Sequence, residues 1–327
     1  MRKINLALIG ATGMVGQTVL KVLEERGVLI DNFYAFGSKR SAGEVITLFG
    51  KEYVSEELSE SSFERDIDIA MFCAGGEVSA EFAEIAASKG CIVVDNSSHF
   101  RMEADVPLVV PEVNPHAIKT HRGIIANPNC STIQAVVALK PLQDNYGLRR
   151  VIYSTYQSVS GAGLSGINAL KDEAPGVFSR PIAYNLIPQI DSFLCNGYTK
   201  EEMKMIDETK KILEQNDLGI TATTVRVPVF YGHSEAINIE LASPFELAEV
   251  KELLGNAPGI ILMDDIEAGV FPTPMDAAGK DEVFIGRIRR DESVENGLNI
   301  FCVADNIRKG AATNAVQIVE LLIKGEF

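Results

Sequence analysis

The sequence predicts an α/β protein with two domains, the first built on an open parallel sheet and the second of α+β type. Residues 4–9 form an apolar run that ends in a glycine-rich turn and continues into a helical pattern at 17–25. An apolar run, a turn, a helical pattern and a second apolar run follow at 67–94. From residue 150 onward, alternating strand patterns are interleaved with helical ones, which indicates a sheet with helices packed on it.

The chain length supports this division. The 327 residues fit two domains, and a hydrophobic fraction of 46% is ample for their cores. We expect the first domain to cover residues 1–129 and to be completed by a returning C-terminal helix at 307–327. Residues 130–306 then form the second domain.

Further elements follow from the same periodicities. We expect strands at 32–36, 67–73, 91–94, 150–157, 221–229 and 235–241, and helices at 78–88, 199–213 and 244–254. Residues 50–66 are polar and predict no element.

The charge balance excludes several classes of partner. The chain has 30 Lys and Arg against 45 Asp and Glu, for a formal charge of −15 and a pI near 4.8. This excess of negative charge disfavours nucleic acid and an anionic membrane as partners. No apolar run is long enough to span a membrane, and the first residues lack a cleavage site, so we expect no targeting segment.

The cysteines and histidines predict neither disulfides nor a metal site. The five cysteines are odd in number and scattered, without a Cys-x-x-Cys pair, which fits a reducing cytoplasm. Three histidines also lack the spacing of metal ligands, namely His99, His116 and His121.

Three glycines follow the first strand in a Gly-x-x-Gly-x-x-Gly spacing: Gly10, Gly13 and Gly16. The spacing differs from the Gly-x-Gly-x-x-Gly fingerprint, but glycines at a helix start equally let a pyrophosphate approach backbone N–H groups. The pattern therefore predicts a Rossmann-type dinucleotide-binding domain. A plain strand-to-helix connection is the alternative.

The end of the second strand favours NADP over NAD. NAD-binding units usually carry an acidic residue here for the ribose hydroxyls, whereas this chain has Gly37, Ser38, Lys39, Arg40 and Ser41. Hydroxyls and cations suit a ribose 2′-phosphate. The alternative is a solvated basic loop.

Cys130 has the flanks of a reactive thiol. Pro128 biases the chain toward an extended conformation, and Asn129, Ser131 and Thr132 are good capping residues, so a helix is predicted to begin near Cys130. The positive end of a helix lowers the pKa of a cysteine and favours the nucleophilic thiolate. A small buried hydrophobic residue is the alternative.

Arg101 is a candidate anion ligand. It closes the run Asp95 to Arg101, which follows a predicted strand at the sheet edge where open α/β sheets bind ligands. A surface arginine without a function is the alternative.

The motifs GATGMVG, DNSSHFR, NPNCST, YQSVSGAG, VRVPVFYGHSEA and ADNIRKGAATNAVQI together resemble those of bacterial aspartate-semialdehyde dehydrogenases, across residues 10–318. The resemblance implies a Rossmann domain and an α+β catalytic domain that also forms a homodimer. It further implies the reversible NADPH-dependent reduction of 4-phospho-L-aspartate to L-aspartate 4-semialdehyde, with release of phosphate. This reaction serves lysine (through diaminopimelate), methionine and threonine biosynthesis.

The resemblance also assigns roles to residues. Cys130 is expected to form an acyl-thioester and His233 to act as general acid/base. The substrate is expected to contact Gln157, Arg226, Glu201, Arg101, Asn129 and Lys204, with Arg226 on the α-carboxylate, Glu201 on the amine and the last three on phosphate. With the glycine turn and the second strand end included, the expected cofactor residues are Gly10, Thr12, Gly13, Met14, Val15, Ser38, Arg40, Ser41, Ser160, Gly161 and Asn306.

Two alternatives remain at this point. Another phosphorylating aldehyde dehydrogenase, such as N-acetyl-glutamyl-phosphate reductase or glyceraldehyde-3-phosphate dehydrogenase, would share the architecture. The reductase would show a Cys-Tyr-Pro-Thr-like run where Cys-Ser-Thr stands here. A non-catalytic dinucleotide-binding regulator is disfavoured by the joint presence of Cys130, Gln157, Arg226 and His233.

Overall fold

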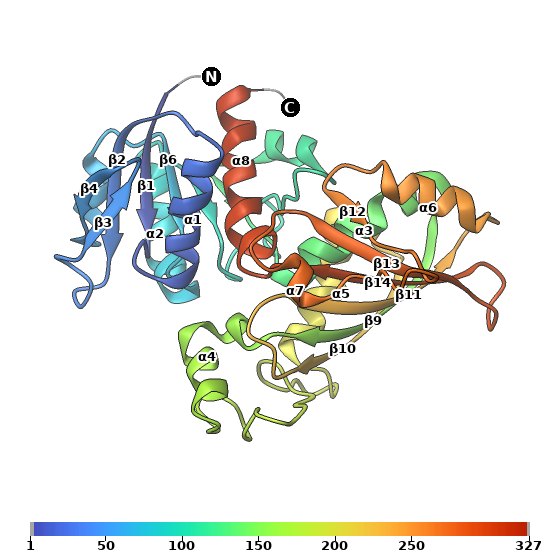
Figure 1. The fold of residues 1–327 in the computed structure, drawn as a ribbon. Helices are drawn as coiled ribbons and strands as arrows, with labels where there is room; N and C mark the ends of the chain where they lie inside the picture. The colour runs from blue at the N-terminus through green and yellow to red at the C-terminus, as the bar shows by residue number, and fades with distance from the viewer. Residues whose placement is uncertain (1–2, 326–327) are drawn as a thin grey trace. The chain divides into compact units, whose positions relative to one another are not determined.

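The computed structural model describes residues 3–325, which divide into two compact units (Figure 1). The first unit comprises the residues up to Pro128 and those from Ala311 onward, and the second comprises Asn129–Gly310. No helix within residues 3–325 has the length and apolarity needed to cross a membrane. The predicted α/β class is confirmed, since a parallel sheet with helices forms the first unit and a mixed sheet with helices forms the second.

The first unit is built on a six-stranded sheet in the order β5-β2-β1-β6-β7-β8, with all neighbours parallel. Its strands are β1 Ile4–Ile9, β2 Ile30–Gly37, β5 Glu56–Glu57, β6 Ile69–Phe72, β7 Ile92–Asp95 and β8 Ile124–Ala126. In the central strand β1, Leu6, Leu8 and Ile9 are fully buried. This is the near-continuous apolar run expected of a parallel strand covered on both faces.

Three helices accompany this sheet: α1 Met14–Glu25, α2 Gly76–Ser88 and α8 Thr313–Lys324. The C-terminal helix α8 packs beside α1, as Figure 1 shows. Val316 and Val319 of α8 belong to the same buried cluster as Val19 and Leu23 of α1. Residues from both ends of the chain therefore build one core.

A hairpin of β3 Val45–Leu48 and β4 Lys51–Val54 was not predicted: β4 lies within the polar residues 50–66, and β3 lies just before them. Of the side chains of β4, only Tyr53 is not exposed, so a strand there leaves little apolar pattern in the sequence. The Tyr53 ring packs edge to face on Phe33 at a centroid distance of 5.0 Å. A tertiary contact thus stabilises a strand that its own sequence barely indicates.

The second unit is built on a mixed six-stranded sheet in the order β10-β9-β11-β14-β13-β12. Its strands are β9 Leu148–Gln157, β10 Gly219–Arg226, β11 His233–Leu241, β12 Ile260–Leu262, β13 Val283–Asp291 and β14 Gly297–Ala304. Its helices are α3 Cys130–Tyr146, α4 Gly163–Lys171, α5 Lys200–Leu213, α6 Leu247–Gly255 and α7 Pro274–Ala277. Short 3₁₀ turns in the two units are η1 Glu60–Glu64, η2 Pro115–Thr120 and η3 Val159–Ala162.

No strand is predicted at 283–304, where β13 and β14 form an antiparallel pair. The outer half of β13 carries Arg287, Arg289 and Arg290, and the register shifts between Gly286 and Arg289. The shift breaks the alternation of side chains that identifies a strand from sequence.

The glycine turn after β1 has two different steric requirements. Gly10 has a positive φ of 83°, which favours glycine. A Cβ at Gly16 would lie 2.2 Å from the carbonyl oxygen of Gly10, so helix α1 can approach the turn this closely only without a side chain there. The spacing of the glycines therefore follows from the packing of α1 on the turn.

We predict that Gly16→Ala destabilises the protein by about 1–3 kcal/mol, because the added methyl group must push backbone apart. Gly76→Ala is the matched control: Gly76 opens α2 with nothing within 4 Å of the added Cβ, so this variant should be as stable as the wild type or slightly more so. Urea unfolding midpoints measure both. Equal midpoints for the two variants would contradict the packing argument.

Candidate active site

Helix α3 begins at Cys130, as predicted. Asn129 is the N-cap, and its Oδ1 accepts hydrogen bonds from the backbone N–H groups of Ser131 at 3.0 Å and Thr132 at 3.3 Å. Cys130 is half-buried, and no disulfide joins any of the five cysteines. The thiol therefore lies at the positive end of a long helix, within the second unit.

Glu201 of α5 connects three of the residues expected to contact substrate. Its Oε1 accepts from Asn129 Nδ2 at 2.9 Å and from Gln157 Nε2 at 3.1 Å, and its Oε2 pairs with Lys204 Nζ at 3.1 Å. Burial raises the pKa of Glu201, but the Lys204 ammonium and the amide donors outweigh burial and leave that pKa below its ordinary value. Glu201 is therefore a buried anion whose charge is matched by its donors.

Lys204 has a second carboxylate partner that the sequence did not indicate. Its Nζ lies 3.0 Å from Asp191 Oδ2, in the loop before α5. Burial lowers the pKa of Lys204, but Glu201 and Asp191 outweigh burial and raise that pKa above its ordinary value. Lys204 thus stays charged, and an anionic ligand must compete with two carboxylates for it.

Arg226 and His233 both lie against Gly161. A Cβ at Gly161 would be 2.7 Å from Arg226 Nη1 and 3.2 Å from His233 Nε2. Arg226 Nη1 donates to the carbonyl oxygen of Ser158 at 2.7 Å. Burial lowers the pKa of Arg226, while the charges of Glu201 and Cys130 act in the opposite direction. The guanidinium is therefore electrostatically coupled to the cysteine as well as to Glu201.

The hydrogen bonds of His233 fix its tautomer. The backbone N–H of Ser158 donates to Nδ1 at 3.1 Å, and the Ser158 hydroxyl lies 3.0 Å from the same atom. A backbone N–H can only donate, so Nδ1 is unprotonated and the neutral ring carries its proton on Nε2. Burial, and secondarily the Arg226 charge, lower the pKa of His233 to about 3. At neutral pH, His233 therefore presents an Nε2–H donor.

The expected cofactor residues of the second unit adjoin the same serine. Asn306 Oδ1 accepts from the Ser158 hydroxyl and from the Gly232 backbone N–H, both at 3.0 Å. The Asn306 amide and the Ser160 hydroxyl are also hydrogen-bonded, at 3.0 Å. Asn306 and Ser160 are thus both hydrogen-bonded to Ser158, and the N–H of Ser158 donates to the His233 ring.

The C-terminal helix predicted at 307–327 does not start as an α-helix: a π-helical turn, Arg308–Ala312, comes first, and α8 begins at Thr313. Gly310 N donates to the carbonyl oxygen of Asp305 at 3.0 Å, and the Asp305 carboxylate accepts from the N–H groups of Ile307 and Arg308. A Cβ at Gly310 would lie 2.9 Å from the Cβ of Cys130. A π turn is often found at functional sites, and in this one position 310 has no room for a side chain against Cys130.

In the first unit, a cavity of about 350 Å³ follows the glycine turn and the end of β2. It is lined by five of the expected cofactor residues, Gly10, Thr12, Gly13, Ser38 and Ser41, together with Lys39 and Glu57. Three other expected residues, Met14, Val15 and Arg40, are not among its lining. Glu57 comes from β5, which pairs with β2, so an acidic residue reaches this cavity from a strand remote in sequence.

Arg101, also in the first unit, is not a surface arginine. It is 8% exposed, and its guanidinium donates to the backbone carbonyl oxygens of Asn127 at 2.9 Å and Asn96 at 3.2 Å. These carbonyl groups fix the orientation of its planar guanidinium group.

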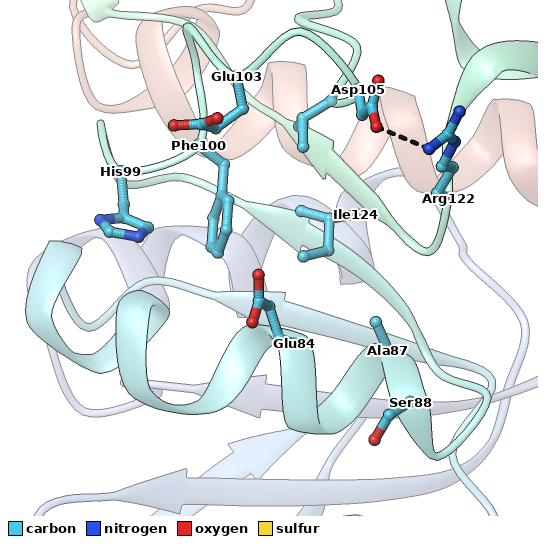
Figure 2. Close-up of a pocket in the computed structure, with 10 residues that line it drawn as sticks. Glu84, Ala87, Ser88, His99, Phe100, Glu103, Asp105, Arg122 and Ile124 are labelled. Atoms are coloured by element: carbon cyan, nitrogen blue, oxygen red, sulfur yellow. Dashed lines mark hydrogen bonds and ion pairs between the residues drawn. The ribbon is translucent and has the colours of Figure 1, made fainter.

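A larger cavity of about 630 Å³ in the first unit has none of the expected site residues in its lining (Figure 2). Figure 2 shows Glu84, Phe100 and Glu103 among the lining residues, and the ion pair of Arg122 with Asp105, which measures 2.7 Å. His99 lines this cavity, but no group of three or more metal-ligating side chains occurs within residues 3–325. Neither the cavity nor its histidine adds to the chemistry around Cys130.

Comparison with known proteins gives matches along nearly the whole chain. The semialdehyde dehydrogenase NAD-binding domain matches residues 5–121, and the semialdehyde dehydrogenase dimerisation domain matches residues 139–309. The aspartate-semialdehyde dehydrogenase of Aquifex aeolicus is 52% identical over 333 aligned residues, which cover 98% of each chain.

Solved structures agree with this match. The crystal structure of aspartate semialdehyde dehydrogenase II from Vibrio cholerae complexed with ASA has 48% identity, a TM-score of 0.95 and full coverage of both chains. The enzyme from Candida albicans, solved with NADP, has 26% identity and a TM-score of 0.79, and covers 98% of this chain and 99% of its own. The chain therefore belongs to the aspartate-semialdehyde dehydrogenase family.

Proposed function

We propose that this chain catalyses the reversible NADP-dependent reduction of 4-phospho-L-aspartate to L-aspartate 4-semialdehyde, with Cys130 as the nucleophile. The observation that carries the proposal is the hydrogen-bonded group around Glu201, which joins the N-cap of the cysteine helix to Gln157 and Lys204. This group brings together the start of the cysteine helix, an amide donor and a cation. The reaction would serve lysine, methionine and threonine biosynthesis.

The chemistry follows from the residue types. The Cys130 thiolate attacks the acyl carbon, the bond to phosphate breaks, and phosphate leaves with the bonding electrons. A nicotinamide bound beside the thioester would supply the hydride for its reduction. The resulting thiohemiacetal then expels the thiolate and releases the aldehyde. Arg226 would pair bidentately with the substrate α-carboxylate, Glu201 would accept from its amine, and Gln157 would orient it.

His233 would act through Nε2, because the Ser158 N–H occupies Nδ1. A neutral imidazole with Nε2–H can donate a hydrogen bond to the carbonyl oxygen of the thioester as negative charge develops there. In this state Nε2 already carries a proton, so the acid/base role expected from the sequence would require the ring to release that proton before it accepts another at the same atom.

The expected phosphate residues differ in their available donors. Lys204 keeps its charge between two carboxylates. Asn129 uses its Oδ1 for the helix cap and one Nδ2 hydrogen for Glu201, which leaves the second hydrogen for an anion. Arg101, in the other unit, has its orientation fixed by backbone carbonyl groups.

The cavity of the first unit fits the adenosine end of a dinucleotide. The positive φ of Gly10 exposes backbone at the start of α1, and Ser38, Lys39 and Ser41 supply two hydroxyls and a cation. These groups, with the neighbouring Arg40, favour NADP, whereas Glu57 would favour a free ribose hydroxyl. We also propose a homodimer formed through the dimerisation domain.

We predict that Cys130→Ser lowers activity by at least about a thousandfold without unfolding the protein, because a hydroxyl is a far poorer nucleophile of similar size. The assay combines aspartate semialdehyde, phosphate and NADP and follows NADPH absorbance. Cys195→Ser, at an exposed cysteine, is the matched control and should keep wild-type activity. A Cys130→Ser enzyme with more than about a tenth of the wild-type rate would rule out the covalent mechanism.

We predict that His233 stays neutral, with its proton on Nε2, between pH 8 and pH 5. Its pKa of about 3 lies below this range, so the ring does not gain a proton where ordinary histidines do. The measurement is ¹H–¹⁵N NMR of ¹⁵N-histidine-labelled protein, with His233→Gln to assign the signal. Titration of this signal near pH 6.5, or a proton on Nδ1, would contradict the assigned tautomer.

We predict that Arg40→Asp raises the KM for NADP by about one to two decades while changing the KM for NAD much less, because a charge-assisted contact to the 2′-phosphate is lost. Arg122→Asp is the control, since Arg122 is an exposed arginine of the same unit that lies at the other cavity. An unchanged NADP to NAD ratio in Arg40→Asp would remove Arg40 from the cofactor site.

A further inference from the structure

We propose that Glu208 is a positioning residue for Cys130: together with Glu201 it clamps Asn129 and thereby sets the start of the cysteine helix. The inference rests on the proposed role of Cys130 as nucleophile. Glu208 lies on α5, is 1% exposed, and its Oε2 accepts from the backbone N–H of Asn129 at 2.6 Å. It therefore holds the residue directly before the nucleophile.

Each polar group of Asn129 makes a hydrogen bond, and the two glutamates accept from its two donor groups. Its backbone N–H goes to Glu208 and its Nδ2 to Glu201. Its Oδ1 accepts from Ser131 and Thr132, and its carbonyl oxygen accepts from Ile133 N at 2.9 Å. Because carboxylates only accept and backbone N–H groups only donate, the orientation of the side-chain amide is fixed as well.

Helix geometry lets the single helix α5 hold both the backbone N–H and the side-chain amide of Asn129. Glu201 and Glu208 are seven residues apart, which is about two helical turns, so both carboxylates lie on the same side of α5. The start of α3 is thus attached to a second helix and not to a loop.

Glu208 could act on Cys130 in two ways, through the hydrogen bond that it accepts or through its negative charge. A carboxylate near a helix N-terminus is favourable, yet negative charge near a thiol opposes formation of the thiolate. Glu208 is therefore expected to act through the hydrogen bond that it accepts and not through its charge. A glutamine at the same position keeps an acceptor oxygen and removes the charge, so it distinguishes the two roles.

The experiment compares Glu208→Leu with Glu208→Gln in the semialdehyde, phosphate and NADP assay. Glu208→Leu should lower kcat about tenfold or more, with the KM values for semialdehyde and phosphate changed less than about threefold, because small displacements of a nucleophile act on the chemical step. Glu208→Gln should remain within about threefold of wild-type kcat. An unchanged kcat in Glu208→Leu, or equal losses in the two variants, would overturn the proposal.

Glu202→Leu is the matched control for general packing. Glu202 is a buried glutamate of the same helix, but its carboxylate accepts from the N–H groups of Thr199 and Thr224 and not from Asn129. This variant should lose thermal stability and keep kcat. A loss of kcat as large as in Glu208→Leu would show that any buried change in α5 has the same effect, and would overturn the positioning role.

Two further measurements keep the test decisive. If Glu208→Leu does not fold, Glu208→Asp replaces it. The shorter aspartate side chain cannot reach the Asn129 N–H, so the kcat of this variant should fall below that of Glu208→Gln, and the reverse order overturns the proposal.

An inactive wild type would instead refute the proposed function. Iodoacetamide alkylation of Cys130, followed by peptide mass spectrometry, then tests the clamp alone: Glu208→Leu should react at least about threefold more slowly than Glu208→Gln, and equal rates overturn it.

Discussion

The second unit depends on one buried anion, the Glu201 carboxylate. A buried charge is costly unless it is paired and hydrogen-bonded, and Glu201 meets this requirement with donors from Asn129, Gln157 and Lys204. These donors belong to the cap of α3, the end of β9 and α5 itself. The need to satisfy a single charge therefore fixes three segments relative to one another at the position where the cysteine helix begins.

Close packing around glycine imposes the second constraint. Gly161 leaves room for Arg226 and His233, and Gly310 leaves room for Cys130, so the reactive side chains approach backbone that carries no Cβ. Ser158 adds specificity, since its N–H holds the imidazole and its carbonyl oxygen holds the guanidinium. One residue thus orients a neutral donor and a cation side by side, and burial with the nearby cation keeps the imidazole neutral.

The same arrangement explains how a chain with a formal charge of −15 can be suited to an anionic substrate. Arg226 and Lys204 stay charged within the second unit, and their carboxylate neighbours reduce the cost of burying them. A further acid on β11, Glu235, is fully buried, and burial together with Glu201 raises its pKa well above the ordinary value. Burial thus disfavours a further negative charge at Glu235, two residues along the same strand from His233.

Sequence signals were sufficient to predict the α/β class, the glycine turn before α1 and the start of α3 near Cys130, because capping, turn and alternation signals lie between close neighbours in the chain. The catalytic roles inferred from the family resemblance stay predictions. Tertiary structure alone decided the partners of Glu208 and Lys204, the tautomer of His233 and the strands β13 and β14. The Glu208 contact joins residues 79 positions apart, and which buried donor meets which acceptor at that separation depends on how the whole unit packs.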